Sequence, residues 1–173
     1  MLSIRPEEPE DYEAISRVNR SAFGQENEAR LVEELRKSKE FLPALSLVAV
    51  MDGEIVGHIL FGRVIIQCRD RNVRALALAP MAIQPQFQRR GIGSQLVEKG
   101  LECCRTSGHQ IVIVVGHPDY YPRFGFSPAR VKGLEVPFPV SDEAFMVIEL
   151  AQGALDGISG MVVYPSPFNA EEG

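Results

Sequence analysis

Residues 76–104 read LALAPMAIQPQFQRRGIGSQLVEKGLECC, and this stretch decides the fold. Residues 76–83 are apolar and interrupted by Pro80, a pattern that predicts a short strand covered on both faces. Proline cannot donate a hydrogen bond to a neighbouring strand, so Pro80 predicts a bulge or a splay. From Ile92 the apolar residues recur with helical spacing, which predicts an amphipathic helix directly after the strand.

The loop between this strand and this helix, residues 88–94, contains two arginines and two glycines. Gly91 and Gly93 would let a ligand approach main-chain N–H groups, because glycine has no side chain. The helix begins with unpaired N–H groups and the positive end of its dipole. With Arg89 and Arg90 beside it, the loop suits a phosphate or a pyrophosphate. The alternative is a tight turn with solvated arginines, and the spacing leaves both interpretations open.

Two other phosphate-binding loops do not fit these residues. A Walker loop requires Lys followed by Ser or Thr directly after its last glycine, where this chain has Ser94 and Gln95. A dinucleotide-binding fingerprint requires a third glycine three residues after the second, and that position is Leu96. The loop therefore matches neither of these motifs.

Length and composition are those of an ordinary globular protein. One domain is the expectation for 173 residues, of which 45% are hydrophobic and 24% are charged. The net charge of −5 provides no basic field for nucleic acid, and no apolar run has the length of a membrane span. The N-terminus has no signal-peptide core and the cysteines form no disulfide framework, so we expect a cytoplasmic protein.

The flanking segments predict further helices and strands. Residues 7–11 open a helix that ends at Gly24, and a second helix covers residues 27–37. The first helix has an apolar stripe of Ile15, Val18, Ala22 and Phe23. The predicted strands are residues 2–6, 46–51, 54–61, 110–116, 145–150 and, at an edge of the sheet, 160–165. Residues 64–68 either continue the strand at residues 54–61 or repeat it. Residues 134–139 are expected to form a loop, and residues 170–173 to fray.

The strand at residues 110–116 follows the central helix, so it is predicted to run parallel to residues 76–83. The carboxyl ends of the two strands then lie at one edge of the sheet, where ligands bind in α/β proteins. After the second strand the chain reads HPDYYPRFGF, starting at His117. His117 is therefore expected near the ligand site. Asp119 is expected to cap the short helix that carries Tyr121.

Two segments together resemble the GNAT superfamily of N-acetyltransferases. Residues 88–93 resemble its Gln/Arg-x-x-Gly-x-Gly/Ala signature, and residues 120–126 resemble the aromatic-Tyr-x-x-x-Gly-Phe segment that follows the fifth strand. The resemblance covers about residues 2–150 and implies a mixed α/β (α+β) fold. Its twisted, mostly antiparallel sheet would contain a central parallel strand pair and be flanked by helices. The chain would be a single domain, residues 1–173, with a C-terminal extension at residues 151–173.

The resemblance also implies the residues of the site. The pyrophosphate of acetyl-coenzyme A (acetyl-CoA) would be bound by Gln88, Arg89, Arg90, Gly91, Ile92, Gly93 and Ser94. Backbone groups of Met81, Ala82 and Ile83 would pair with the pantetheine amides and polarise the thioester carbonyl. Tyr121 would act as the general acid for the departing thiolate, because a phenol of pKa about 10 suits a thiol of pKa about 8.5.

The predicted activity is acetyl transfer from acetyl-CoA to a primary amine by direct attack in a ternary complex, without a metal ion. The acceptor, a small molecule or a peptide, stays open, as does the choice between monomer and homodimer. No base is assigned among Glu26, Glu28 and Glu54. His58 is expected to be packed and hydrogen-bonded in its strand. The alternatives are a CoA-binding regulatory module without catalysis and an interaction domain whose glycine loop is only a turn.

Overall fold

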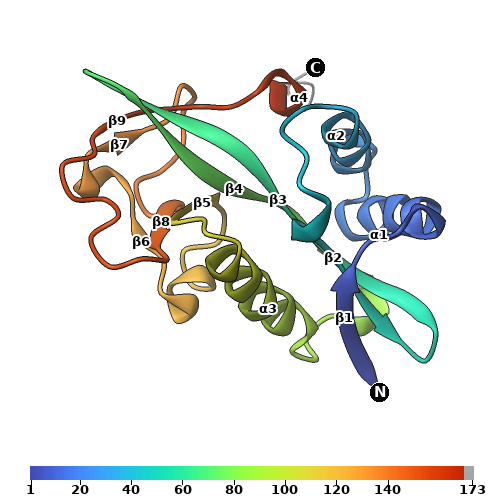
Figure 1. Cartoon of the computed structure of the whole chain (residues 1–173). Coiled ribbons are helices and arrows are strands. Elements are labelled where there is room, and N and C mark those ends of the chain that lie inside the picture. The colour runs from blue at the N-terminus through green and yellow to red at the C-terminus, as the bar shows by residue number, and fades with distance from the viewer. Residues whose placement is uncertain (170–173) are drawn as a thin grey trace.

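The computed structural model describes residues 1–169 as one sheet with helices on both faces (Figure 1). The strands are β1 (Leu2–Pro6), β2 (Ser46–Met51), β3 (Glu54–Cys68), β4 (Asn72–Ile83), β5 (Ile111–Val115), β6 (Ser127–Pro128), β7 (Leu134–Glu135), β8 (Phe145–Glu149) and β9 (Gly160–Val163). The α-helices are α1 (Tyr12–Phe23), α2 (Asn27–Arg36), α3 (Ile92–Thr106) and α4 (Ser166–Asn169). The 3-10 helices are η1 (Pro9–Asp11), η2 (Pro43–Leu45), η3 (Pro85–Phe87), η4 (Tyr121–Phe124) and η5 (Arg130–Lys132). The expected fraying at residues 170–173 lies outside the described residues.

The strands pair in the order β1-β2-β3-β4-β5-β8-β6, and most of these pairs are antiparallel. The central pair, β4 and β5, runs parallel, as the intervening helix α3 requires. The short strands β7 and β9 form a second parallel pair. The predicted fold class, a mostly antiparallel sheet with a central parallel pair flanked by helices, is confirmed.

The central parallel pair is short, and its two strands then separate. β5 pairs with β4 at Leu76 and Ala77, after which β4 continues to Ile83 without a partner on that side among the described residues. On the other side of β4, the register with β3 shifts at Pro80. The bulge predicted at Pro80 is confirmed, whereas the splay from β5 begins after Ala77, before Pro80 is reached. The splay opens the sheet at the carboxyl end of β5.

Two apolar clusters cover the two faces of the sheet. Figure 1 shows α3 on one side of β3 and β4, and α1 and α2 on the other. The predicted stripe of α3 is buried at Ile92, Leu96, Val97, Leu101 and Cys104. α1 ends at Gly24, whose φ of 67° is left-handed. Its predicted stripe is buried at Ile15 and Val18, whereas Phe23 is 41% exposed, which frees this ring for contacts outside the core.

The face covered by α1 and α2 also contains a buried polar network. His58 is fully buried, with Nε2 2.9 Å from Ser46 Oγ and Nδ1 3.4 Å from Asn19 Nδ2. Ser46 also donates to Glu7, which accepts two hydrogen bonds from Arg36 at 2.9 and 3.1 Å. The expectation that His58 is packed and hydrogen-bonded is confirmed.

Residues 64–68 continue the strand of residues 54–61, one of the two predicted alternatives, and together they form β3. Two expectations for individual segments need correction. Residues 160–165 are not an edge strand, because β9 pairs with β3 on one side and β7 on the other. Leu134 and Glu135 form β7, so the predicted loop at residues 134–139 starts two residues later.

The single-domain division stays a prediction, although β9, within the expected C-terminal extension, is paired into the sheet. Within residues 1–169, no helix combines the length and the apolar character that crossing a bilayer would require.

Candidate active site

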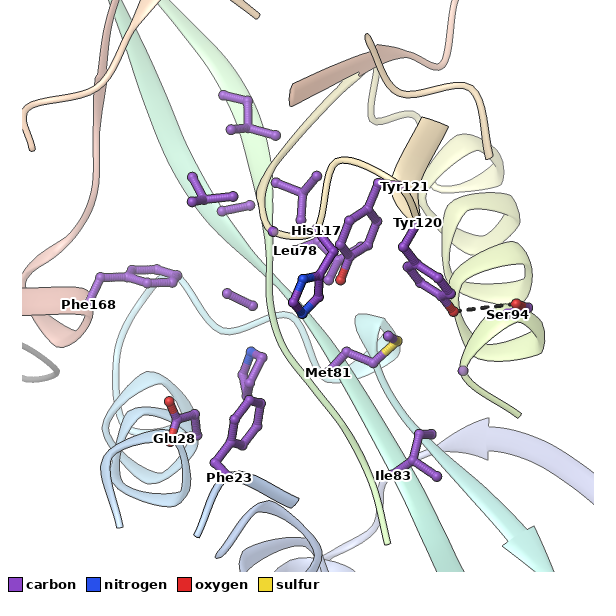
Figure 2. A pocket seen from close by; sticks show the side chains of 18 of the residues that line it. Phe23, Glu28, Leu78, Met81, Ile83, Ser94, His117, Tyr120, Tyr121 and Phe168 are labelled. Atoms are coloured by element: carbon purple, nitrogen blue, oxygen red, sulfur yellow. Dashed lines mark hydrogen bonds between the residues drawn. The ribbon is translucent and has the colours of Figure 1, made fainter. Parts of the chain in front are cut away.

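A cleft of about 1650 Å³ follows the separated part of β4. Its lining includes the predicted glycine loop, the segment after β5, and residues of α1, α2 and the C-terminal segment. In the view of Figure 2, Ser94 and Tyr120 lie on one side of β4, and Glu28 and Phe168 lie on the other. Tyr121, His117 and Met81 lie between these two ends. The cleft therefore joins segments that are far apart in the sequence.

The glycine loop forms one end of the cleft. Gly91 is the N-cap of α3 with a φ of 80°, so the first N–H groups of the helix point out of it without intrahelical partners. Arg89 also has a positive φ, 65°, and Gln88 donates a 3.1 Å hydrogen bond to the carbonyl of Ile83. This bond ties the loop to the end of β4. The loop is therefore a fixed row of donors at the positive end of a helix dipole.

The loop residues do not all face the cleft. Of the seven predicted to bind the pyrophosphate, six line it: Gln88, Arg89, Gly91, Ile92, Gly93 and Ser94. Arg90 is not among the lining residues, and its guanidinium lies 5.2 Å from the centre of the Phe87 ring. The two neighbouring arginines therefore have different surroundings.

Gly93 marks a close approach between the loop and the segment after β5. A Cβ atom at this position would lie 3.0 Å from the Tyr120 hydroxyl. The same hydroxyl is 3.4 Å from Ser94 Oγ, and the guanidinium of Arg123 lies 4.7 Å from the centre of the Tyr120 ring. Tyr120 is thus a neighbour of the glycine loop, and any side chain at Gly93 would crowd it.

The separated part of β4 contributes the floor of the cleft. Met81 and Ile83 line it, whereas Ala82 is buried and pairs in register with His58 on β3. The side chains of this strand alternate between the two faces of the sheet, so the Ala82 side chain lies away from the cleft. Because β5 has moved away, the backbone of residues 78–83 has no strand neighbour on that edge among the described residues, and its polar groups are open to a ligand.

Tyr121 lies between the two ends, at the start of η4. Its side chain is buried, and its ring occupies the space beside Gly116, where a Cβ atom would lie 2.6 Å from the ring. The ring also contacts Tyr120 and Phe126 edge to face. Burial raises the pKa of Tyr121 to about 12. The hydroxyl therefore stays protonated at neutral pH and can donate a hydrogen bond.

The predicted cap on this short helix is wrong. Tyr120, rather than Asp119, is at the N-cap of η4, and no side chain caps it. The carbonyl of His117 instead accepts hydrogen bonds from the N–H groups of Tyr120 and Tyr121, at 3.1 and 3.4 Å. The backbone turn is complete without a side-chain acceptor, which removes the need for Asp119.

The other end of the cleft contains a carboxylate and several aromatic rings. Glu28 is the only acid among the lining residues that the structure describes. Glu26, two residues earlier, pairs with Arg20 at 2.8 Å, and neither Glu26 nor Glu54 lines the cleft. Figure 2 shows Phe23 and Phe168 on the same side of β4 as Glu28, and the Tyr164 ring contacts those of Phe168 and Phe138. All four aromatic residues line the cleft.

The sequence does not identify several of these residues as part of the site. Phe168 and Tyr164 lie in a segment whose sequence predicts only a strand and a tail, and Gly116 reads as the end of a strand. Phe23 was expected to be part of the core. Within residues 1–169, no three His, Cys, Asp or Glu side chains gather in a way that could hold a metal ion.

Comparison with known proteins identifies relatives of the whole chain. A family model described as an acetyltransferase (GNAT) domain matches residues 3–129. The chain is 36% identical over 169 residues to a protein of Escherichia coli (strain K12) named uncharacterized N-acetyltransferase YhbS, covering 97% of this chain and 99% of YhbS. It is 42% identical over 134 residues to the E. coli protein named uncharacterized N-acetyltransferase YjhQ, covering 77% of this chain and 74% of YjhQ.

Two solved structures share the fold over nearly the whole chain. One is the crystal structure of the E. coli GNAT family N-acetyltransferase YhbS in complex with CoA, with a TM-score of 0.90 and 33% sequence identity. The match covers 97% of this chain and 92% of the YhbS chain. The other is the crystal structure of a GNAT family acetyltransferase from Brucella melitensis in complex with acetyl-CoA, with a TM-score of 0.79 and 29% sequence identity. The match covers 97% of this chain and 98% of the Brucella chain.

Proposed function

The chain belongs to the GNAT family of acetyltransferases, and from this premise we propose that it transfers an acetyl group from acetyl-CoA to a primary amine by direct attack in a ternary complex. The observation that carries this proposal is the separation of β4 from β5. It opens one cleft that contains the N-terminus of α3, an unpaired strand edge and the Tyr121 hydroxyl. These three features suit a diphosphate, a chain of amides and a sulfur atom.

The residues of the cleft fit acetyl-CoA, which supplies the acetyl group as a thioester. The N–H groups at the start of α3 would hold the diphosphate, with Arg89 and Arg123 adding positive charge. Backbone groups of Met81, Ala82 and Ile83 would pair with the pantetheine amides along the open edge of β4. Both E. coli YhbS and the Brucella protein were crystallised with CoA or acetyl-CoA, which supports the assignment.

In the proposed chemical step, the neutral amine attacks the thioester carbonyl, a C–N bond forms and the C–S bond breaks. The Tyr121 hydroxyl donates a hydrogen bond, and then its proton, to the departing sulfur. The nitrogen loses one proton to water as the amide forms, and water returns a proton to Tyr121. With a pKa of about 12, Tyr121 is a weaker acid than an exposed phenol. Hydrogen bonding to the developing thiolate therefore contributes more than complete early proton transfer.

Direct transfer is favoured over an acetylated enzyme because no cysteine is available as a nucleophile. None of the three cysteines, Cys68, Cys103 and Cys104, is among the described residues that line the cleft. Burial also raises the pKa of Cys104 to about 12, which keeps it as a thiol.

The test is to remove the Tyr121 hydroxyl. We expect Tyr121→Phe to lower kcat by on the order of a hundredfold while the Kd for acetyl-CoA stays nearly unchanged, because the hydroxyl contributes when the sulfur becomes charged. The matched variant is Tyr120→Phe, whose hydroxyl lies beside Ser94. It should instead raise the Kd for acetyl-CoA a few-fold. Thiol release measured over an amine panel gives kcat, and calorimetry gives the Kd.

The same measurements separate the enzyme from a regulatory CoA-binding module. A module would bind acetyl-CoA but release no thiol with any amine in the panel. An unchanged kcat in Tyr121→Phe would remove this residue from the mechanism.

A further inference from the structure

The two ends of the cleft have opposite charge. Arg89 and Arg123 line the end formed by the glycine loop, whereas Glu28 is the only carboxylate among the lining residues within the described part of the chain. Figure 2 shows Glu28 and Ser94 on opposite sides of β4, with Tyr121 between them. A ligand pair that fills the cleft would therefore be anionic at one end and cationic at the other.

Glu28 is available to bind a cation. Gln25 donates to both of its carboxylate oxygens at 3.1 Å, which orients the carboxylate without neutralising it. Within residues 1–169, no Lys, Arg or His nitrogen lies within ion-pair distance of Glu28, unlike Glu26 nearby on the same segment, which pairs with Arg20. An oriented carboxylate that lacks a protein cation and lines a cleft is suited to a cationic ligand.

The surroundings of Glu28 favour an organic cation over a metal ion. Phe168 and Tyr164 contact each other edge to face with ring centres 5.3 Å apart, and both line the cleft together with Phe23. Aromatic faces attract organic cations, and their apolar area suits a hydrocarbon chain. A metal ion would require several further oxygen or nitrogen ligands, which residues 1–169 do not supply at this end of the cleft.

The charge bound at Glu28 is not that of the reacting nitrogen, because that nitrogen must lose its proton before attack. A neighbouring carboxylate would raise the pKa of an ammonium and disfavour the neutral form. The group at Glu28 must therefore be one that remains charged while another nitrogen reacts near Tyr121.

We propose that the acceptor has two positive charges separated by an apolar spacer: a primary amine that reacts beside Tyr121, and a second cationic group held by Glu28. This inference rests on the proposed function and specifies its substrate class. The spacer passes Phe23, which projects from the end of α1 and is 41% exposed. Short alkyl diamines and their longer analogues are the simplest members of this class.

The first experiment measures binding without turnover. The protein loaded with CoA is titrated by calorimetry with α,ω-diaminoalkanes of increasing length and with the matching primary monoamines. We expect the best diamine to bind about tenfold more tightly than its monoamine, with an optimum in chain length. Glu28→Gln should abolish this difference. Glu26→Gln, which makes the same change of charge outside the cleft, should preserve it.

The second experiment uses acetyl-CoA and measures thiol release. In Glu28→Gln, kcat/KM for the diamine should fall about tenfold through KM, a larger loss than for the monoamine, whereas Glu26→Gln should keep kcat/KM for both amines. Equal affinity for diamine and monoamine in the unaltered protein, or equal losses in Glu28→Gln and Glu26→Gln, would overturn the inference. Acetyl transfer to monoamines would then still support the proposed function. Conversely, Glu28-dependent diamine binding without any transfer would support this site and overturn the proposed function.

Discussion

The face of the sheet under α3 and the face under α1 and α2 are built differently, and each supports a different end of the cleft. The α3 face is packed by aliphatic and aromatic side chains, and the helix presents its backbone N–H groups at the glycine loop. The opposite face buries His58, Ser46 and Asn19 and also holds the Glu7–Arg36 ion pair. The helices on this second face carry Phe23 and Glu28 into the cleft.

This difference separates two ways of building a binding site. The glycine-loop end depends mainly on backbone N–H groups at the start of α3, to which Arg89 and Arg123 add positive charge. The Glu28 end depends on side chains held by helices that pack over buried charge. Changes to the polar network should therefore act on stability and on the Glu28 end, whereas changes to the loop should act on acetyl-CoA alone.

The largest expected effect comes from breaking the ion pair beneath α2. The Glu7 side chain is 3% exposed and that of Arg36 is 12% exposed. Glu7→Gln leaves the guanidinium without its charged partner, so we expect a loss of about 3 kcal/mol in the free energy of unfolding. The matched control is Glu34→Gln, whose carboxylate pairs with Lys37 on the surface and should change stability by less than about 0.5 kcal/mol.

Urea unfolding of both variants measures this difference. If Glu7→Gln and Glu34→Gln lost the same free energy, the buried network would not be what holds α2 against the sheet.

The sequence predicts the glycine-loop end far better than the Glu28 end. The loop is a contiguous stretch, and a strand, two glycines and a helix start define its geometry without knowledge of the rest of the chain. Pro80 likewise predicts the bulge in β4, because its missing N–H is a local property. The Glu28 end is assembled from α1, α2 and the segment after β9, and no periodicity links Glu28 to Phe168.

The buried network illustrates the same limit. The position of His58 within an apolar strand was enough to predict that it is packed and hydrogen-bonded. Its partners, Ser46 and Asn19, come from another strand and from a helix, so only the pairing of β2 with β3 and the packing of α1 identify them. Gly116 is similar, because its lack of a side chain is explained by the Tyr121 ring packed against it.

The next largest effect is expected at Gly93. Gly93→Ala places a Cβ atom 3.0 Å from the Tyr120 hydroxyl and at the helix start where the diphosphate would lie. We expect the Kd for acetyl-CoA to rise roughly thirtyfold, equivalent to about 2 kcal/mol, with little change in the Kd for the amine. Calorimetry measures both constants, and thermal unfolding verifies that the variant is folded.

The double variant Gly93→Ala/Tyr120→Phe identifies the cause. It removes the crowded hydroxyl but keeps the new methyl group at the loop, so acetyl-CoA binding should stay weak. Recovery to the affinity of the Tyr120→Phe protein would mean that the methyl group acts through Tyr120 and not by blocking the main-chain donors.

A smaller effect should distinguish the two loop arginines. Arg89 lines the cleft, whereas Arg90 lies over the Phe87 ring. We expect Arg89→Gln to raise the Kd for acetyl-CoA roughly tenfold, about 1.4 kcal/mol, and Arg90→Gln to raise it less than about threefold. The Arg89 effect should shrink as salt is added, since it is electrostatic. Equal losses in the two variants would show that both side chains reach the ligand.

The smallest effect is a loss of folding stability in mild acid. This loss should affect the face of the sheet under α1 and α2 before the face under α3. Burial lowers the pKa of His58 from its ordinary value of 6.5, against the opposing influence of Glu7. At a pH between the lowered pKa of His58 in the folded protein and its pKa of 6.5 in the unfolded chain, only the unfolded chain binds a proton. Stability therefore falls as the pH drops below 6.5. Burial alone would raise the pKa of Glu7, but hydrogen bonds from His58, Arg36 and Ser46 outweigh it and hold the pKa below 4.5. Protonation of Glu7 therefore adds a second loss at lower pH.

These two losses can be separated by His58→Gln, which removes the imidazole but keeps a hydrogen-bonding side chain. The loss of stability below pH 6.5 should become smaller in this variant without vanishing, because burial and the nearby Arg63 also lower the pKa of His109. The loss at lower pH, where Glu7 is protonated, should remain. Hydrogen exchange in the unaltered protein should accelerate in α1 and α2 before α3 as the pH is lowered, because the titrating groups lie under the first two helices. Simultaneous acceleration in all three helices would mean that the two faces open together, and the difference between the two ends of the cleft would then be one of chemistry and not of stability.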